Sequence, residues 1–296
     1  MNLVVILSLL ASLFGSSWNP TVTNYGSEPK TFHGTLPLEI FSKPHLQNKD
    51  AIFNGIEAKG LFLSNLNSGT VLAYKNPDQN FSTASITKLM TALVVLENYN
   101  SSEVVTVSYK AASINGSIIH LAAGEQIAVS QLILGMLIGS GNDAATALGE
   151  HFGEGDLVTL MNEKAKSLEM KNTHFADASG LSLENRSTPR DLTILTKAAL
   201  KYQMISDAVK SLSATLTSAD GITQHLIHTT NRLLKNYSDI FGVKTGYTDE
   251  AGFCLISLAE RNGNKLLLVL LGSPSDDGRF DESRVILDRA FENITW

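Results

Sequence analysis

Three short polar strings follow one another along the chain: Ser85-Ile86-Thr87-Lys88, Ser140-Gly141-Asn142 and Lys244-Thr245-Gly246. Each supplies a hydroxyl, amine or amide, and the combination is typical of enzymes that form an ester with their own serine. Each string alone is weak, since Ser27-Glu28-Pro29-Lys30 is a second S-x-x-K and Ser17-Trp18-Asn19 a second S-x-N. Their order, with gaps long enough for separate elements to converge on one cleft, predicts a serine acyl-transfer site.

The bulk composition excludes several other functions. The chain has 296 residues and a net charge of −6, and without a dense Lys/Arg block we expect no nucleic-acid binding. The single cysteine, Cys254, excludes an internal disulfide and sits in an apolar run typical of a buried core. The histidines show no metal-ligand spacing. We therefore expect no metal and no cofactor.

Apolar residues dominate the first fourteen positions, a run too short to span a bilayer in the usual way. We interpret residues 1–17 as a signal peptide or an N-terminal membrane anchor, and expect an exported protein, periplasmic or on the extracytoplasmic face of the membrane. Residues 18–55 lack periodicity and are predicted to be a linker. Residues 56–296 form the predicted catalytic domain, with no further C-terminal β domain.

The pattern of apolar residues predicts an α+β fold. A hairpin is expected around Asn67-Ser68-Gly69, and strands are expected again after about residue 215. Helices are expected between them, at 85–97, 129–138, 144–152, 157–168 and 189–202, and one amphipathic helix from about 281 to 291 closes the chain. Thr188 before Pro189 is a plausible helix cap. Strands at both ends around a helical middle predict an antiparallel β-sheet flanked by helices, with an inserted helical lobe.

The residue types suit acyl transfer. Ser85 needs a base, and Lys88 lies one helical turn away. Lys88 must then have a lowered pKa, for which burial and Lys244, as a second cation, both provide a cause. The backbone N–H of Ser85 is a candidate oxyanion donor. Without the other two strings, Ser85 would be read as the cap of a core helix.

Ser140 and Asn142 follow an apolar helix, so that a hydroxyl for proton transfer and an amide for substrate can face one cavity. The same segment also fits a helix C-cap, and Gly139–Ala144 matches a dinucleotide-binding fingerprint that lacks a clear βαβ context.

The third string offers groups for binding a peptide. Lys244 and the Thr245 hydroxyl can hold a carboxylate, and Gly246 allows close approach of a backbone. The N–H of Tyr247 can complete the oxyanion pair.

Longer blocks around these strings, 83–92, 140–145 and 242–252, resemble the low-molecular-mass penicillin-binding proteins that act as D-alanyl-D-alanine carboxypeptidases. Segments 172–175, 179–181 and 230–234 also match, so that the resemblance covers roughly residues 57–292. It implies a β-lactamase/transpeptidase-like fold with the active site at the interface. It also implies that Ser85 is the nucleophile, Lys88 the proton acceptor and Ser140 the second hydroxyl. Lys244, Thr245 and Arg279 would bind the substrate carboxylate.

The resemblance implies removal of the terminal D-alanine from peptidoglycan stem peptides ending in D-Ala-D-Ala, through an acyl-enzyme, with β-lactams as covalent inhibitors. Three alternatives stay open: a D,D-endopeptidase of the same fold, a class A-like β-lactamase, and a non-catalytic sensor of peptidoglycan or β-lactam. The β-lactamase would need a carboxylate-activated water, and 150–190 contains no matching Glu-rich loop. An intact Lys88 argues against the sensor.

Overall fold

The computed structural model describes residues 43–47 and 49–296. The predicted signal peptide or anchor at 1–17, and the predicted linker up to residue 42, lie outside the described residues. Within the described ranges, none of the helices combines the length and apolar character needed to cross a bilayer.

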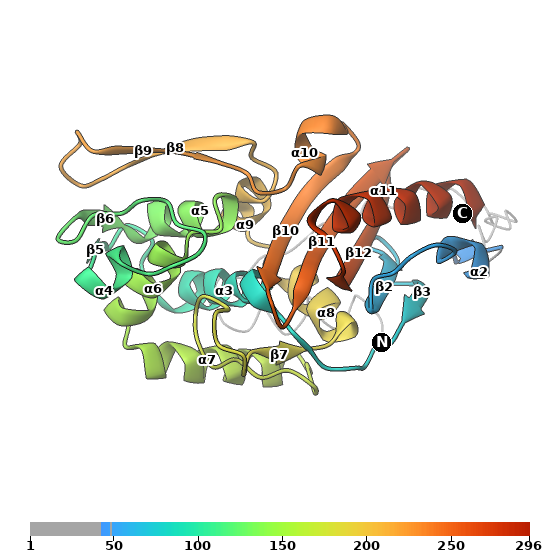
Figure 1. Cartoon of the computed structure of the whole chain (residues 1–296), viewed down its shortest axis with the longest axis horizontal. Coiled ribbons are helices and arrows are strands. Elements are labelled where there is room, and N and C mark those ends of the chain that lie inside the picture. Colours follow the sequence, from blue (N-terminus) through green and yellow to red (C-terminus); the bar gives the residue numbers. More distant parts are fainter. Residues whose placement is uncertain (1–42, 48) are drawn as a thin grey trace, which may run out of the picture. The chain divides into compact units, whose positions relative to one another are not determined.

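A five-stranded sheet organises the folded unit, in the order β10-β11-β12-β2-β3 (Figure 1). The strands are β2 (Gly60–Asn65), β3 (Val71–Lys75), β10 (Ile240–Thr248), β11 (Gly252–Arg261) and β12 (Asn264–Ser273). Every neighbouring pair is antiparallel. The sheet therefore joins strands from near the start and the end of the described chain, as the sequence predicted.

Alternation along β12 assigns its side chains to two apolar clusters, because successive residues of a strand point to opposite faces. Leu268 and Leu270 pack in one cluster with Ile286 of helix α11 (Asp276–Asn293). Leu267 and Val269 pack in the other, with the helices of the inserted lobe. The sheet is thus covered on both faces, and one edge strand, β10, borders the lobe (Figure 1).

The lobe between β3 and β10 is mostly helical. Its helices are the 3-10 helix η1 (Ala84–Thr87), α3 (Lys88–Asn98), α4 (Tyr109–Ala112), α5 (Val129–Ile138), α6 (Asn142–His151), α7 (Glu154–Ser167), α8 (Pro189–Ala199), α9 (Gln203–Ala208) and α10 (Leu233–Asn236). Its short strands pair as β4 (Phe81–Ser82) with β7 (Arg186–Ser187), β5 (Val104–Thr106) with β6 (Gln126–Ala128), and β8 (Ser213–Thr217) with β9 (Gln224–His228). The β4–β7 pair ties the segment before Ser85 to the loop before α8.

Two predictions of local structure are confirmed in detail. The hairpin around Asn67-Ser68-Gly69 is β2–β3. Thr188 caps α8, because its hydroxyl oxygen accepts a hydrogen bond from the Asp191 N–H at 3.1 Å.

Several predicted boundaries differ from the structure; the helix expected at 189–202, for example, ends at Ala199. The last helix begins at Asp276 rather than near residue 281, because the Ser275 hydroxyl accepts from the Gly278 N–H and starts the helix earlier. The described end of the expected linker is folded: β1 (His45–Leu46) pairs with β13 (Ile294–Thr295), and α2 (Lys49–Ile52) follows. Leu46 and Ile52 are buried in the core. Apolar side chains spaced by polar residues gave too little periodicity to show this.

Candidate active site

Ser85 lies in η1, one turn before the start of α3 at Lys88. Lys88 Nζ lies 2.8 Å from Ser85 Oγ, because positions i and i+3 share a helix face. Ala84, next to the serine, has a φ of 45°, a left-handed conformation that L-residues rarely adopt. Such an unfavourable backbone conformation persists only where the surrounding structure holds it in place.

Lys88 is fully buried and contacts two further oxygen atoms. Its Nζ donates to Asn142 Oδ1 at 2.7 Å and to the Ser179 carbonyl at 2.5 Å. Burial lowers the pKa of Lys88 to about 7, against the opposing effect of the Asp177 and Asp143 carboxylates, which raise it. Near neutral pH a large share of Lys88 is therefore a neutral amine, which can accept a proton.

Ser140 and Asn142 lie where α5 ends and α6 begins. Ser140 has a φ of 59°, and this left-handed turn directs its hydroxyl toward Lys244. Asn142 Oδ1 accepts the hydrogen bond from Lys88, and the Asn142 amide donates one hydrogen to the Asn115 carbonyl at 2.8 Å. A second amide hydrogen remains, so Asn142 positions Lys88 and keeps one donor for a ligand.

Lys244 reaches the same place from β10. Its Nζ donates to Ser140 Oγ at 2.8 Å and to the Thr245 carbonyl at 3.1 Å. Burial holds the pKa of Lys244 well below its usual value, and the charges of Lys88 and Arg279 lower it further. Burial thus lowers the pKa of both amines, as expected for Lys88, and the charge of Lys88 lowers the pKa of Lys244 further.

Two glycines bring separate elements against the Ser85 backbone. A Cβ on Gly180 would lie 1.9 Å from the Ala84 carbonyl oxygen, and one on Gly246 would lie 3.3 Å from the Ser85 nitrogen. The lack of a side chain at Gly246 thus serves the approach of β10 to Ser85, a packing role beside the ligand role expected from the sequence.

Arg279 and Tyr247 border the same space. Arg279 lies in the first turn of α11, buried, and its Nη1 donates to the Gly246 carbonyl at 3.0 Å. Tyr247 is 49% exposed, stacks on Phe253 and donates its hydroxyl hydrogen to Asp249.

These elements enclose a cleft of about 320 Å³. Its lining includes seven residues singled out from the sequence: Ser85, Ser140, Asn142, Thr245, Gly246, Tyr247 and Arg279. Lys88 and Lys244 lie just beneath, bonded to Ser85 and Ser140. All nine predicted site residues therefore gather at one place.

The cleft also contains residues that the sequence reading did not assign to the site, among them Ser117, Leu181 and Thr230. The Thr230 hydroxyl lies 2.6 Å from that of Thr245. Thr230 and Leu181 belong to segments that carried the family resemblance, which was the available signal. Ser117 had none.

One other reading of the middle string can now be judged. Gly139–Ala144 connects two helices rather than a strand to a helix, so the dinucleotide interpretation is wrong. In the described part of the chain, no group of three or more His, Cys, Asp or Glu residues is arranged to hold a metal ion.

Comparison with known proteins gives the family. Residues 47–275 match the family model described as D-alanyl-D-alanine carboxypeptidase. The chain belongs to this family. It is 36% identical over 243 residues to the D-alanyl-D-alanine carboxypeptidase DacF of Bacillus subtilis, covering 79% of this chain and 62% of DacF. It is also 37% identical over 210 residues to a D-alanyl-D-alanine endopeptidase of Pseudomonas aeruginosa, covering 69% of this chain and 68% of that protein.

The fold has solved relatives. The crystal structure of the Streptomyces K15 DD-transpeptidase superposes with a TM-score of 0.74 at 35% identity, covering 80% of this chain and 98% of that one. The predicted family, the α+β fold and the class of serine hydrolase are confirmed. The chain spans less than two thirds of DacF.

Proposed function

We propose that this chain is a serine-type D-alanyl-D-alanine carboxypeptidase that removes the terminal D-alanine of peptidoglycan stem peptides. The observation that carries the proposal is the 2.8 Å contact between Ser85 Oγ and Lys88 Nζ, in a family named for this activity. The comparisons with DacF and the K15 enzyme support it.

Binding is proposed to begin with the substrate carboxylate. Lys244, the Thr245 hydroxyl and Arg279 supply positive charge and donors at one end of the cleft. This places the peptide bond before the last D-alanine over Ser85. The backbone N–H groups of Ser85 and Tyr247 are our candidates for the oxyanion hole.

Acylation then requires that one proton leaves the Ser85 hydroxyl and that another reaches the departing amine. Neutral Lys88 takes the proton of Ser85 as its oxygen attacks the carbonyl, and a C–O bond forms. When the C–N bond breaks, the departing amine of D-alanine takes a proton from the Ser140 hydroxyl, which Lys244 resupplies. Before the second half, Lys88 must release the proton it took from Ser85, and Lys244 must regain one. Water then attacks the acyl-enzyme while neutral Lys88 takes its proton, and the Ser85 oxygen takes that proton back as the ester C–O bond breaks.

The lining of the cleft disfavours the β-lactamase alternative. It contains no Asp or Glu among the residues that the structure describes, whereas a class A-like enzyme needs a carboxylate to activate the deacylating water. β-Lactams are therefore proposed as slowly released covalent inhibitors. The sensor alternative is disfavoured by the complete set of acceptors around Lys88.

A D,D-endopeptidase is the second candidate, favoured by the 37% identity to the Pseudomonas aeruginosa endopeptidase. The same chemistry would cut a cross-link between two stem peptides. The cleft residues do not separate the two substrates, because in both the bond to be cut has a D-alanyl residue on its acyl side.

The test is incubation with a pentapeptide ending in D-Ala-D-Ala and, separately, with a cross-linked peptide dimer. Release of free D-alanine from the pentapeptide is the expected result. Cleavage of the dimer alone would favour the endopeptidase, and rapid hydrolysis of benzylpenicillin would favour the β-lactamase. Penicillin labelling without turnover of any peptide would favour the sensor.

The place of action is also proposed from the substrate. Stem peptides of peptidoglycan lie outside the cytoplasm, so the apolar run at the start of the chain is proposed to direct export, as a signal peptide or as a membrane tether. Residues 56–296 are proposed as the catalytic domain, together with the described residues 43–47 and 49–55.

A further inference from the structure

The three oxygen atoms around Lys88 set a geometric condition on its role as a base. A neutral amine has two N–H donors and one lone pair. If Asn142 Oδ1 and the Ser179 carbonyl each accept one hydrogen, the lone pair is left to face Ser85 Oγ. The direction of the lone pair therefore depends on how firmly the Ser179 carbonyl is held.

The turn that carries this carbonyl is built around one carboxylate, that of Asp177. Its Oδ1 accepts from the N–H groups of Ser179 at 2.9 Å and Gly180 at 2.5 Å. Its Oδ2 accepts from the Ser182 N–H at 2.5 Å, and Asn185 donates its side-chain amide to Oδ1 at 3.1 Å. The Asp177 side chain thus accepts hydrogen bonds from backbone N–H groups on both sides of the Ser179 carbonyl.

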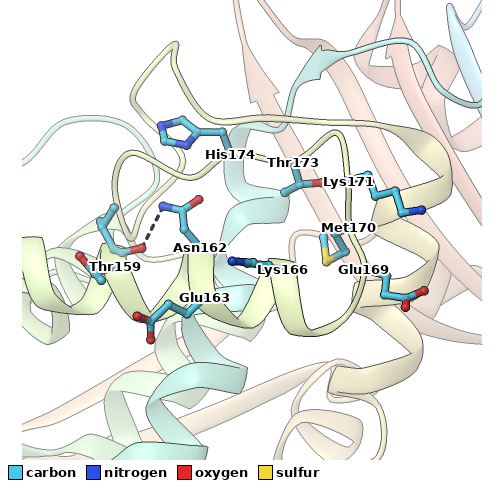
Figure 2. A pocket seen from close by; sticks show the side chains of 10 residues that line it. Thr159, Asn162, Glu163, Lys166, Glu169, Met170, Lys171, Thr173 and His174 are labelled. Atoms are coloured by element: carbon cyan, nitrogen blue, oxygen red, sulfur yellow. Dashed lines mark hydrogen bonds between the residues drawn. The ribbon is translucent and has the colours of Figure 1, made fainter.

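The segment before Asp177 is fixed by α7. The Asn162 side chain accepts a hydrogen bond from the Phe175 N–H at 2.9 Å and donates one to the Phe175 carbonyl at 2.8 Å. This pair of hydrogen bonds fixes the backbone of Phe175. Figure 2 shows Asn162 pointing from α7 toward the loop that carries Thr173 and His174. This side of the loop lines a separate pocket of about 710 Å³. Phe175 itself is fully buried, so the turn starts from a rigid base.

On its other side the turn packs against the nucleophile. Gly180 has a φ of 88°, and its Cα lies so close to the Ala84 carbonyl that no side chain fits. The Asp177 turn therefore contacts both members of the Ser85–Lys88 pair, one through Gly180 and the other through Ser179.

We propose that Asp177 is a positioning residue for acyl transfer at Ser85: it fixes the Ser179 carbonyl that orients Lys88, and its charge stabilises the ammonium that Lys88 becomes. The inference rests on the proposed function. Proton transfer moves one proton from Ser85 Oγ to Lys88 Nζ as the Ser85 C–O bond forms, and Asp177 exchanges no proton.

Charged groups from several elements face Lys88. Asp177 on the loop and Asp143 on α6 both raise its pKa, and Asp177 has the larger effect. The Asp143 carboxylate is bonded to the backbone N–H groups of Ile119 and Leu121. Lys244 on β10 is the facing cation, with Arg279 of α11 beyond it. Removing the Asp177 charge must therefore lower the pKa of Lys88.

The test is the Asp177→Asn variant, assayed as the rate of acylation by a fluorescent penicillin between pH 5 and 9. Neutral Lys88 is the active form, so the acidic limb should move to lower pH by about half a unit or more. The plateau rate should fall roughly tenfold, because one acceptor is lost and the carbonyl shifts. An acidic limb that stays in place would overturn the proposal.

Asp220→Asn is the matched control. Asp220 organises a similar turn, between β8 and β9, by accepting from the N–H groups of Ile222 at 2.8 Å and Thr223 at 2.9 Å, and it lines neither Ser85 nor Lys88. Its acylation rate and pH profile should match the unmodified protein. A shift of the limb equal to that of Asp177→Asn would contradict a specific role of Asp177.

Asp177→Glu covers the case in which the Asn variant does not fold. This change keeps the charge but displaces the turn, so the plateau should fall while the acidic limb stays close to its original pH. An unchanged plateau would overturn the positioning role. If the unmodified protein itself is not acylated, the proposed function fails. If the unmodified and variant proteins are acylated equally, only the role of Asp177 fails.

Discussion

Lys244 Nζ lies 2.8 Å from Ser140 Oγ, although 104 residues separate the two along the chain. Lys244 comes from an edge strand of the sheet and Ser140 from the turn between two helices of the lobe. Their contact joins sheet and lobe at the cleft. It also places a buried amine, as a source of protons, beside the Ser140 hydroxyl.

Ser140→Ala should lower D-alanine release about a hundredfold, because the path of the proton from Lys244 to the departing amine is removed. The Lys244 ammonium keeps the Thr245 carbonyl as an acceptor, so folding should persist. Steady-state release of D-alanine measures the effect. Ser213→Ala, at an exposed position of β8, is the control. Equal rates for both variants would remove Ser140 from the mechanism.

The pH dependence of acylation should follow Lys88. Its pKa is lowered to about 7, and only the neutral amine accepts the Ser85 proton. The rate of penicillin labelling should therefore rise with pH through about 7 and level off above it, and fall below as Lys88 becomes charged. Labelling kinetics between pH 5 and 9 test this. A rate that is constant across the range would show that Lys88 is not the base.

Gly180→Ala should disrupt the site. The new Cβ would lie 1.9 Å from the Ala84 oxygen, on a backbone with a φ of 88°. We expect a loss of about 2 kcal/mol or more in the free energy of unfolding and a fall in penicillin labelling. Thermal unfolding and labelling measure the two effects.

The control for this change is Gly221→Ala. Gly221 also has a positive φ, 72°, but nothing lies within 4 Å of the added Cβ. Its cost should be the backbone strain alone, about 1 kcal/mol, with normal labelling. Similar losses of labelling in the two variants would mean that strain, and not the clash with Ala84, is responsible.

Sequence patterns predicted the parts of this site that depend on side-chain identity and local spacing. The i, i+3 relation of Ser85 and Lys88 and the strand at Lys244 follow from periodicity. The antiparallel sheet follows from apolar runs at both ends of the described chain.

The missed parts depend on main-chain atoms or on distant packing. The Ser179 carbonyl that contacts Lys88 carries no signature, since every residue has a carbonyl. Asp177 belongs to none of the three strings, and its role depends on hydrogen bonds from backbone N–H groups of its own turn. Burial was expected to lower the pKa of Lys88, but the carboxylates of Asp177 and Asp143, which oppose that effect, could not be placed near Lys88 from the sequence.

Peptide mapping after exposure to benzylpenicillin tests the central claim most directly. The account predicts one covalent adduct, on Ser85, in the unmodified protein and none in a folded Lys88→Ala variant. An adduct on another residue, or normal labelling of Lys88→Ala, would contradict it.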